Sequence, residues 1–263
     1  MHWWKNTSRE TEIMNKFIVG GWSQSLSVEP LKEFDVMMYG MVTYLDGLTT
    51  GTPAKPGWSP ERQDKPDNLP GFKGKTLWVY GGGGCSPEGK PSNKSEVLRI
   101  AEATKSRGWD GVDFDDECNM NIDLVIEAMK QLKNCQKDTS YGFIAGYSYN
   151  HPATDNGKKL NDKIKVLIQS GQCDRLIHYC YAAAMWSRED IVGNVIPALR
   201  RTLKLGAENK KCILALTTRG LTDWALNYFI DQVLDFNLGG LFIWKYENLK
   251  KEHLTTIKER MWK

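Results

Sequence analysis

Several features that would mark a membrane or metal-binding protein are missing from this sequence. No apolar run in its 263 residues approaches the length of a membrane span. The segment Met1 to Lys16 is polar and charged apart from Trp3 and Trp4, so it lacks the apolar middle region of a secretory signal. We therefore expect a protein without a membrane partner that is either cytoplasmic or secreted with its signal already removed.

Metal-ligand spacing is also lacking. The four histidines are scattered, and none of the six cysteines stands in a Cys-x-x-Cys pair. Cysteines spread through a domain with its own core are typical of free thiols. The sequence thus predicts no metal site, and free thiols at positions 85, 118, 135, 173, 180 and 212.

The charge is nearly balanced. A net charge of +3, from 35 basic and 32 acidic residues that are well mixed, leaves no basic stripe of the kind that binds nucleic acid. Apolar residues make up 41% of the chain, which is enough for a core of ordinary size. These values predict a globular protein with no nucleic-acid partner.

The most informative segment is the acidic stretch Asp110 to Glu117. Apolar Val112 and Phe114 alternate with Asp113, Asp115 and Glu117, and alternate side chains of a β-strand point to opposite faces. The three carboxylates should therefore share one face. Like charges so close raise at least one pKa, and a protonated acid beside an ionised one is suited to acid-catalysed bond cleavage.

Two simpler interpretations fit the stretch less well. An acidic run is often a solvated loop, but Val112 and Phe114 are large and apolar, and the turn-like Trp109-Asp110-Gly111 precedes them. A calcium-binding EF-hand loop needs Gly at its sixth position, and counting from Asp113 this position holds Cys118. Asp116 has the opposite parity from Asp115 and should face outward.

Eight apolar segments read as strands with helical patterns between them, and several are nearly continuous apolar runs, as in buried parallel strands. The pattern predicts an α/β fold, a single-domain (β/α)8 TIM barrel without a large inserted subdomain, spanning residues 15–263 after an extension at 1–14. An open doubly wound sheet is the alternative. The expected strands are Lys16–Gly21, Asp35–Tyr44, Thr76–Gly81, Gly111–Asp116, Tyr141–Tyr147, Leu176–Tyr181, Cys212–Thr217 and Gly240–Trp244.

Local signals place the helices. Asn119 or Asn121 should begin one helix, Thr222 another, and Gly108 and Gly171 should follow the ends of two more. Pro197 lies within a helical pattern, so we expect two pieces or a late helix start there.

One long segment shows no helical period. Five prolines punctuate the stretch from Leu45 to Lys75, which follows the second strand and therefore belongs to the face of a barrel where active sites form.

Asp110 to Glu117 fits the pattern Asp-Gly-x-Asp-x-Asp-x-Glu in full, and with it the chain resembles glycoside hydrolase family 18, the chitinases and endo-β-N-acetylglucosaminidases. Gly81-Gly82 is similar to the family's Ser-x-Gly-Gly segment, with Val79 in place of Ser. Tyr181 stands where the family has a Tyr, but Ala182 follows it where Asp or Asn is usual. Trp244 ends the eighth strand, as in many chitinases.

The resemblance implies a substrate-assisted retaining mechanism, in which the 2-acetamido oxygen of the sugar attacks its own anomeric carbon. Glu117 would be the general acid and then the base, Asp115 would hold the acetamido N–H, and Asp113 would tune Asp115. Tyr181 would position the acetamido oxygen, although Tyr179 has the same parity. No metal or organic cofactor is needed.

A second set of residues is expected to bind substrate. Trp244 would be the floor of the −1 subsite, and the rings of Trp22, Trp58 and Trp186 would be outer sugar platforms. Tyr147 and Asn150 would line the cleft beside Gly81. His178 alternates with Tyr179 and should face the helices, and Cys118 is interpreted as a packing thiol.

The resemblance favours an endo-acting hydrolase of β-1,4-linked N-acetylglucosamine, as in chitin or chitooligosaccharides. Its partner would be such a saccharide, and the protein is expected to be a monomer. The first alternative is an endo-β-N-acetylglucosaminidase acting on the chitobiose core of N-glycans. The second is a carbohydrate-binding barrel without catalysis, for which Val79 and Ala182 would be the signs.

Overall fold

The structure, a computed structural model, describes residues 17–23, 29–44, 49–50, 71–82, 91–106, 108–117, 119–146, 150–180 and 187–262. For residues 40–44 and 49–50 it describes the backbone alone. The expected N-terminal extension, 1–14, lies outside these ranges.

Eight parallel strands close into a barrel, as the sequence predicts. Each strand pairs with its neighbours in the order β1-β2-β4-β5-β6-β7-β8-β9, and β9 pairs with β1 to complete the ring. Five of the expected strands agree with the structure to within one residue at each end. The bounds are β1 Ile18–Ser23, β2 Val36–Tyr44, β4 Lys75–Gly81, β5 Gly111–Asp116, β6 Asp138–Ile144, β7 Arg175–Tyr179, β8 Cys212–Thr217 and β9 Gly240–Trp244.

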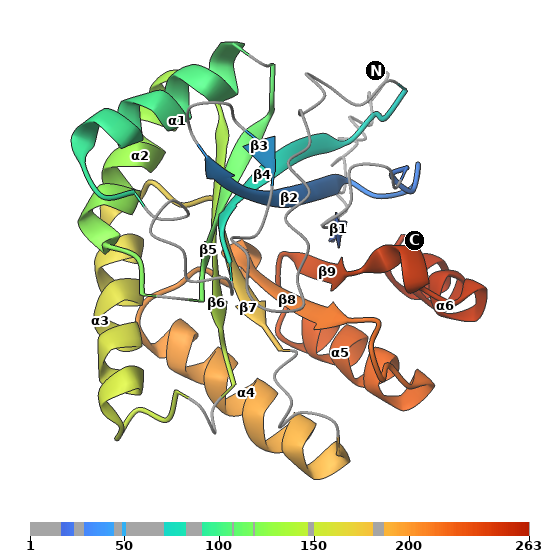
Figure 1. The fold of residues 1–263 in the computed structure, drawn as a ribbon. Coiled ribbons are helices and arrows are strands. Elements are labelled where there is room, and N and C mark those ends of the chain that lie inside the picture. Colours follow the sequence, from blue (N-terminus) through green and yellow to red (C-terminus); the bar gives the residue numbers. More distant parts are fainter. Residues whose placement is uncertain are drawn as a thin grey trace, which may run out of the picture.

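Six helices surround this barrel within the described part of the chain (Figure 1). The expected caps are found: Asn121 accepts from the N–H groups of Asp123 and Leu124, Thr222 accepts from that of Ala225, and Gly171 ends its helix in the left-handed conformation. The helices are α1 Lys94–Ser106, α2 Ile122–Asn134, α3 Asp155–Ser170, α4 Arg188–Lys204, α5 Asp223–Asp235 and α6 Lys251–Met261, with short 3-10 turns η3 Asn209–Lys211 and η4 Tyr246–Asn248.

The expected break at Pro197 is wrong. Helix α4 runs through Pro197 from its cap at Ser187. A proline inside a helix costs about 3 kcal/mol, but Val195, Ala198 and Leu199 around it are at most 1% exposed. Burial of a side chain such as Val195 or Leu199 stabilises the folded state by about 1.5–3 kcal/mol. The packing of α4 against the barrel therefore outweighs the cost of the proline.

Between Leu45 and Lys75 the structure describes a short strand, β3 Thr49–Thr50, which the sequence did not predict. It pairs antiparallel with the end of β2, through Thr50 with Val42 and Thr49 with Tyr44. The rest of this proline-rich segment, up to residue 70, lies outside the described residues.

Two apolar clusters divide the core according to the alternation of the strands. A larger one lies between barrel and helices and contains Val112 and Phe114, and a smaller one fills the barrel interior and contains Val79 and Tyr179. Because both faces of each strand are covered, the strands read as continuous apolar runs.

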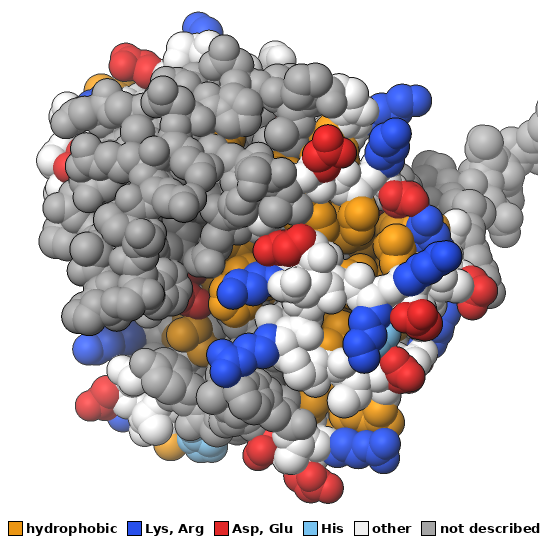
Figure 2. Space-filling model, turned by 45° about the vertical axis from the view of Figure 1, so that its right-hand side comes forward, with side chains coloured by type: hydrophobic (Ala, Val, Ile, Leu, Met, Phe, Trp, Pro, Cys, Tyr) orange, Lys and Arg blue, Asp and Glu red, His pale blue; other side chains and the backbone are white. Residues whose placement is uncertain are grey.

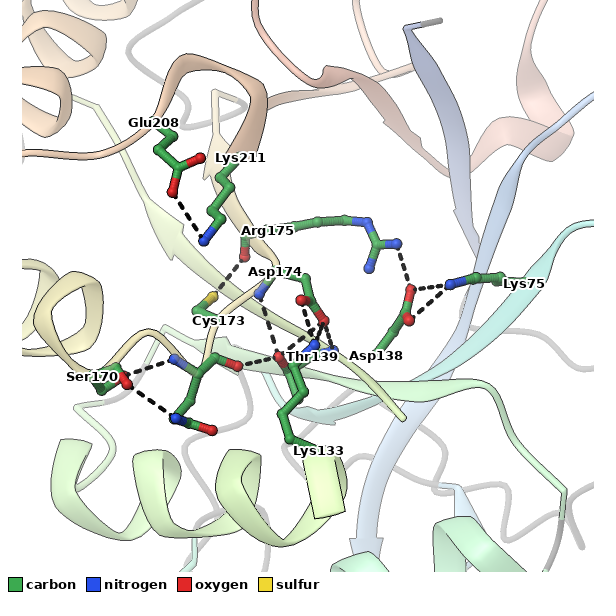
Figure 3. Close-up of polar contacts among 11 residues, drawn as sticks. Lys75, Lys133, Asp138, Thr139, Ser170, Cys173, Asp174, Arg175, Glu208 and Lys211 are labelled. Carbon is green, nitrogen blue, oxygen red and sulfur yellow. Dashed lines mark hydrogen bonds and ion pairs between the residues drawn. The ribbon is translucent and has the colours of Figure 1, made fainter. Parts of the chain in front are cut away.

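The amino ends of the strands are joined by ionic contacts (Figure 3). Asp138 pairs with Lys75 at 2.8 Å and with Arg175 at 2.5 Å, so the first residues of β4, β6 and β7 are tied together. Burial would raise the pKa of Asp138, but the hydrogen bond from Lys75 and the charge of Arg175 outweigh it and hold that pKa below its ordinary value. This end of the barrel thus has its acids paired with bases.

Aspartates just before the strands add a recurring contact. Asp35, Asp110 and Asp174 precede β2, β5 and β7, and each accepts a hydrogen bond from a backbone N–H on the preceding strand of the ring, at Val19, Thr76 and Thr139 respectively. These bonds help to fix the register between neighbouring strands.

On the face in Figure 2, basic and acidic side chains are interspersed. None of the helices in the ranges given above has the length and apolar character needed to traverse a lipid bilayer.

Because Pro197 lies inside α4, we expect Pro197→Ala to stabilise the protein. The change restores a helical N–H and removes the ring's clash with the preceding turn, so the free energy of unfolding should rise by about 1–3 kcal/mol. Urea denaturation measures this. Val192→Ala, on an exposed position of the same helix, is the control and should change stability little; a Pro197→Ala protein less stable than the wild type would contradict the account.

Candidate active site

The acidic strand β5 is arranged as the alternation predicts. Val112 and Phe114 pack in the cluster between barrel and helices, whereas Asp113 and Asp115 are 0% and 1% exposed and belong to the opposite, inner face. Glu117 follows the strand with the same parity and is half-buried. Two carboxyl groups therefore lie on the inner face, and Glu117 follows them at the carboxyl end of β5.

Asp113 is the deepest of the three, and hydroxyl groups from two other strands hold it. Ser140 on β6 donates to Oδ1 at 2.6 Å, and Tyr179 on β7 donates to Oδ2 at 3.1 Å. Burial raises the pKa of Asp113 to about 6, while the two hydroxyls and the charge of Arg175 act in the lowering direction. Asp113 is thus protonated at higher pH than an isolated aspartate.

Asp115 has a different environment. Within the part of the chain that the structure describes, neither of its carboxyl oxygens accepts a hydrogen bond. Burial, then the charges of Glu117, Asp113 and Asp116, raise the pKa of Asp115 well above its ordinary value, against a lowering effect of the nearby Tyr179 hydroxyl. Burial also raises the pKa of Glu117. The group therefore keeps protons that isolated carboxyls would lose.

Asp116 and His178 face the helices, as expected. Asp116 accepts from Lys163 on α3 at 2.6 Å and from Tyr141 at 2.5 Å, and its other oxygen accepts from the N–H of Met120. His178 contacts Thr202 on α4 at 2.9 Å, and burial lowers its pKa to about 4. Both side chains support packing outside the barrel.

The glycines after β4 lie against the acidic strand. Gly81 and Gly82 have φ values of +107° and +102°, and the N–H of Gly82 donates to the carbonyl of Asp115 at 2.9 Å. A Cβ at Gly81 would lie 2.4 Å from that same carbonyl oxygen, so only glycine fits. Val79 is the register partner of Asp113 and offers it no donor.

Three aromatic rings cross the barrel interior toward the acids. Trp244 at the end of β9 is half-buried, and its ring stacks on Trp22 with centroids 5.5 Å apart. Trp22 in turn stacks on Tyr179 at 6.1 Å. Trp22 is 4% exposed, so it lies inside the barrel beside Trp244, and not at the outer position that the sequence analysis expected.

Glu117 opens onto a hollow of about 210 Å³ between the barrel rim and α3. Asn150, Asn156 and Lys159 line it together with Glu117. Asp116 and Lys163, which pair on the outer side of β5, line it as well, so the hollow lies outside the barrel interior. Asn150 is 7% exposed and is fixed through its donation to the Ile144 carbonyl at 2.6 Å. The predicted cleft residue Asn150 and the predicted acid thus border the same space.

Some predicted site residues lie outside the described ranges, and their roles stay predictions: Tyr181, Tyr147, Trp186 and Trp58, with Ala182 and Cys118. Three residues beside the acids were not predicted from the sequence. Ser140 and Tyr179 donate to Asp113, and Gly142 leaves room for the Tyr179 hydroxyl. Strand parity alone could have shown that Tyr179 points inward, but only the pairing of β5 with β6 and β7 shows what it reaches.

Cysteines and metal ligands add little to the site. Cys135, Cys173, Cys180 and Cys212 are free thiols. In the ranges that the structure describes, no group of three or more His, Cys, Asp or Glu side chains is placed to hold a metal ion.

The raised carboxyl pKa values predict that stability depends on pH. A folded-state pKa above the unfolded one favours folding at low pH, and this contribution is lost as the pH rises through the folded pKa. For Asp113, the interval from 3.8 to about 6 corresponds to a loss of about 3 kcal/mol. Because part of this loss already occurs below pH 4, Asp113→Asn should lose about 2 kcal/mol less unfolding free energy than the wild type between pH 4 and pH 8, as measured by denaturant titration. Equal pH dependence in the two proteins would contradict this.

Comparison with solved structures finds the same barrel in carbohydrate-active enzymes. A chitinase from Chromobacterium violaceum superposes with a TM-score of 0.65 at 10% identity, covering 94% of this chain and 99% of that one. A mutant chitinase domain from Pyrococcus furiosus, complexed with chito-oligosaccharides, gives 0.60 at 13% identity, covering 87% and 83%. A fungal endo-β-N-acetylglucosaminidase of glycosyl hydrolase family 18 gives 0.56 at 13% identity, covering 87% and 90%.

Sequence comparisons add no relative. No protein-family profile matches the chain, and no curated sequence matches it significantly. At these identities the likeness concerns the fold: the chain has the barrel fold of the family 18 glycoside hydrolases.

Proposed function

We propose that this protein is a family 18 glycoside hydrolase that cleaves β-1,4 bonds between N-acetylglucosamine residues inside chitin or chitooligosaccharides. One observation carries the proposal: Asp113 and Asp115 are buried on the inner face of β5, and Glu117 follows at its carboxyl end. In a barrel, that end is where active sites form. The likeness in fold to chitinases supports it further.

The acid of the reaction is Glu117. It is half-buried, burial raises its pKa, and it borders an open hollow, so a protonated carboxyl is available to a leaving-group oxygen. A raised pKa near the working pH is what a general acid needs. After the bond breaks, the same carboxylate accepts a proton from the incoming water.

Asp115 acts on the sugar's 2-acetamido group, which replaces an enzyme nucleophile in this mechanism. No described residue occupies its oxygens with a hydrogen bond, so one is ready to accept the acetamido N–H. Accepting it orients the carbonyl oxygen toward the anomeric carbon and stabilises the positive charge that develops on the acetamido group. Asp113, next to Asp115 on the same face, sets how strongly Asp115 holds its proton.

The sugar platform is the ring of Trp244. It ends β9, is half-buried, and has Trp22 stacked behind it, which holds the ring in place for a pyranose to stack on. We further propose that Tyr181 hydrogen-bonds the acetamido oxygen, and that Tyr147, Trp186 and Asn150 extend the cleft.

The second candidate is an endo-β-N-acetylglucosaminidase acting on the chitobiose core of N-glycans. One observation favours it, the barrel likeness to the fungal enzyme with that activity. Both substrates present the same N-acetylglucosamine unit to Glu117. Trp244 favours chitin.

Removing the acid should abolish hydrolysis. Glu117→Gln keeps the shape but donates no proton to the leaving group, so kcat on chitooligosaccharides should fall at least about 10²-fold. The matched control is Glu102→Gln, the same chemical change at an exposed position of α1, which should leave kcat unchanged. A fully active Glu117→Gln protein would refute the proposed function, and saccharide binding without turnover by the wild type would favour a binding barrel.

The configuration of the first product tests the mechanism. Two displacements at the anomeric carbon return it to its starting configuration, so proton NMR during early hydrolysis should show the β-anomer first. An α-anomer as the first product would exclude participation of the acetamido group. Running the reaction on chitooligosaccharide and on a high-mannose glycopeptide in parallel also orders the two candidate substrates.

A further inference from the structure

Among the residues that the structure describes, the side chains that donate to Asp113 come from one side of the barrel. These donors are Ser140 on β6 and Tyr179 on β7, whereas the register partner of Asp113 on β4 is Val79, which has no polar group. Val79 is where the resemblance would place a serine. The environment of this buried carboxyl therefore depends on β6 and β7.

The reach of Tyr179 to Asp113 depends on a missing side chain. Gly142 lies on β6, between β5 and β7, as the register partner of both Asp115 and Ile177. A Cβ on Gly142 would lie 2.0 Å from the Tyr179 hydroxyl and 2.2 Å from its Cζ. The phenol thus occupies the space that any other residue at position 142 would fill.

The ring of Tyr179 is fixed on its other side as well. Trp22 stacks on it with centroids 6.1 Å apart and an interplanar angle of 22°, and Tyr179 is 1% exposed. The hydroxyl of a ring held in this way lies 3.1 Å from Oδ2 of Asp113, to which it donates, and it also lowers the pKa of the neighbouring Asp115.

We propose that Tyr179 is a positioning residue that keeps Asp113 the ionised member of the carboxyl group, so that the proton is held by Asp115 and Glu117, where the chemistry uses it. The catalytic part of this inference rests on the proposed function. A hydrogen bond to the charged form of an acid favours that form. Because the three carboxyls interact, holding the charge at Asp113 biases the proton toward the other two.

Other charged groups of the described residues face the barrel interior near Asp113. Besides Asp115 and Glu117 on β5, the inner-face charged groups are Lys75 on β4, Asp138 on β6 and Arg175 on β7, which contact one another at the amino end of the barrel. On the wall formed by β1 and β9, Trp22 and Trp244 carry no charge. Replacing Tyr179 alters none of these charges, so a change in Asp113 titration would report the hydroxyl.

The test is the titration of Asp113 in Tyr179→Phe, followed by carbon-13 NMR of labelled aspartate carboxyls and assigned with Asp113→Asn. Losing a hydrogen bond to a carboxylate should raise the Asp113 midpoint by about one pH unit. Tyr141→Phe is the matched control. Tyr141 is a buried tyrosine on β6, and its hydroxyl also donates to a carboxylate of β5. That carboxylate is Asp116, which faces the helices and not the barrel interior. It should leave the midpoint unchanged.

A second variant separates the position of the phenol from its presence. Gly142→Ala keeps the hydroxyl but forces it away from Asp113, so it should raise the midpoint as Tyr179→Phe does. An unchanged midpoint in Tyr179→Phe, or an equal shift in Tyr141→Phe, would overturn the proposal.

The kinetic consequence is distinct from the titration. The acidic limb of kcat/KM reports groups of the free enzyme, and in Tyr179→Phe it should move to higher pH by about one unit, with no such move in Tyr141→Phe. An acidic limb that stays in place while the midpoint shifts would refute the catalytic role of Tyr179. If the wild type hydrolyses no substrate, the proposed function fails, and the titration still decides whether Tyr179 holds the charge on Asp113.

Discussion

Burial of two carboxyl groups, Asp113 and Asp115, on the inner face of β5 is the constraint around which the rest of the barrel interior is arranged. Desolvation disfavours the charged form of each group, and their proximity to Glu117 adds repulsion. Asp113 accepts hydrogen bonds from two hydroxyl groups. The carboxyl oxygens of Asp115 accept none from the residues that the structure describes. Such an arrangement lowers stability, which is the usual consequence of building a reactive site into a folded core.

The two ends of the barrel treat acids in opposite ways. At the amino end, Asp138 and Asp174 are paired with basic side chains, and Asp138 has a lowered pKa. Toward the carboxyl end, Asp115 and Glu117 have raised pKa values. In such barrels the loops at the carboxyl end build the active site, whereas the amino end serves stability. Acidic residues therefore stabilise the fold at one end of the barrel and provide reactive groups at the other.

Much of this could be read from the sequence, and the reasons are physical. Period-two alternation placed the acids, Asp116 and His178 on their correct faces, and continuous apolar runs indicated a buried parallel barrel. The helix break predicted at Pro197 is wrong, because local helix propensity takes no account of the packing of α4 against the barrel. The roles of Ser140, Tyr179 and Gly142 could not be derived, because they depend on which residues of three strands come into register, and a single sequence does not encode register visibly.

The most direct test of the account is a crystal structure of Glu117→Gln with a chitooligosaccharide bound. The account predicts an N-acetylglucosamine ring over Trp244, with its acetamido nitrogen within hydrogen-bonding distance of Asp115 and the glycosidic oxygen beside position 117. A saccharide bound elsewhere on the protein, with Asp115 untouched, would contradict it.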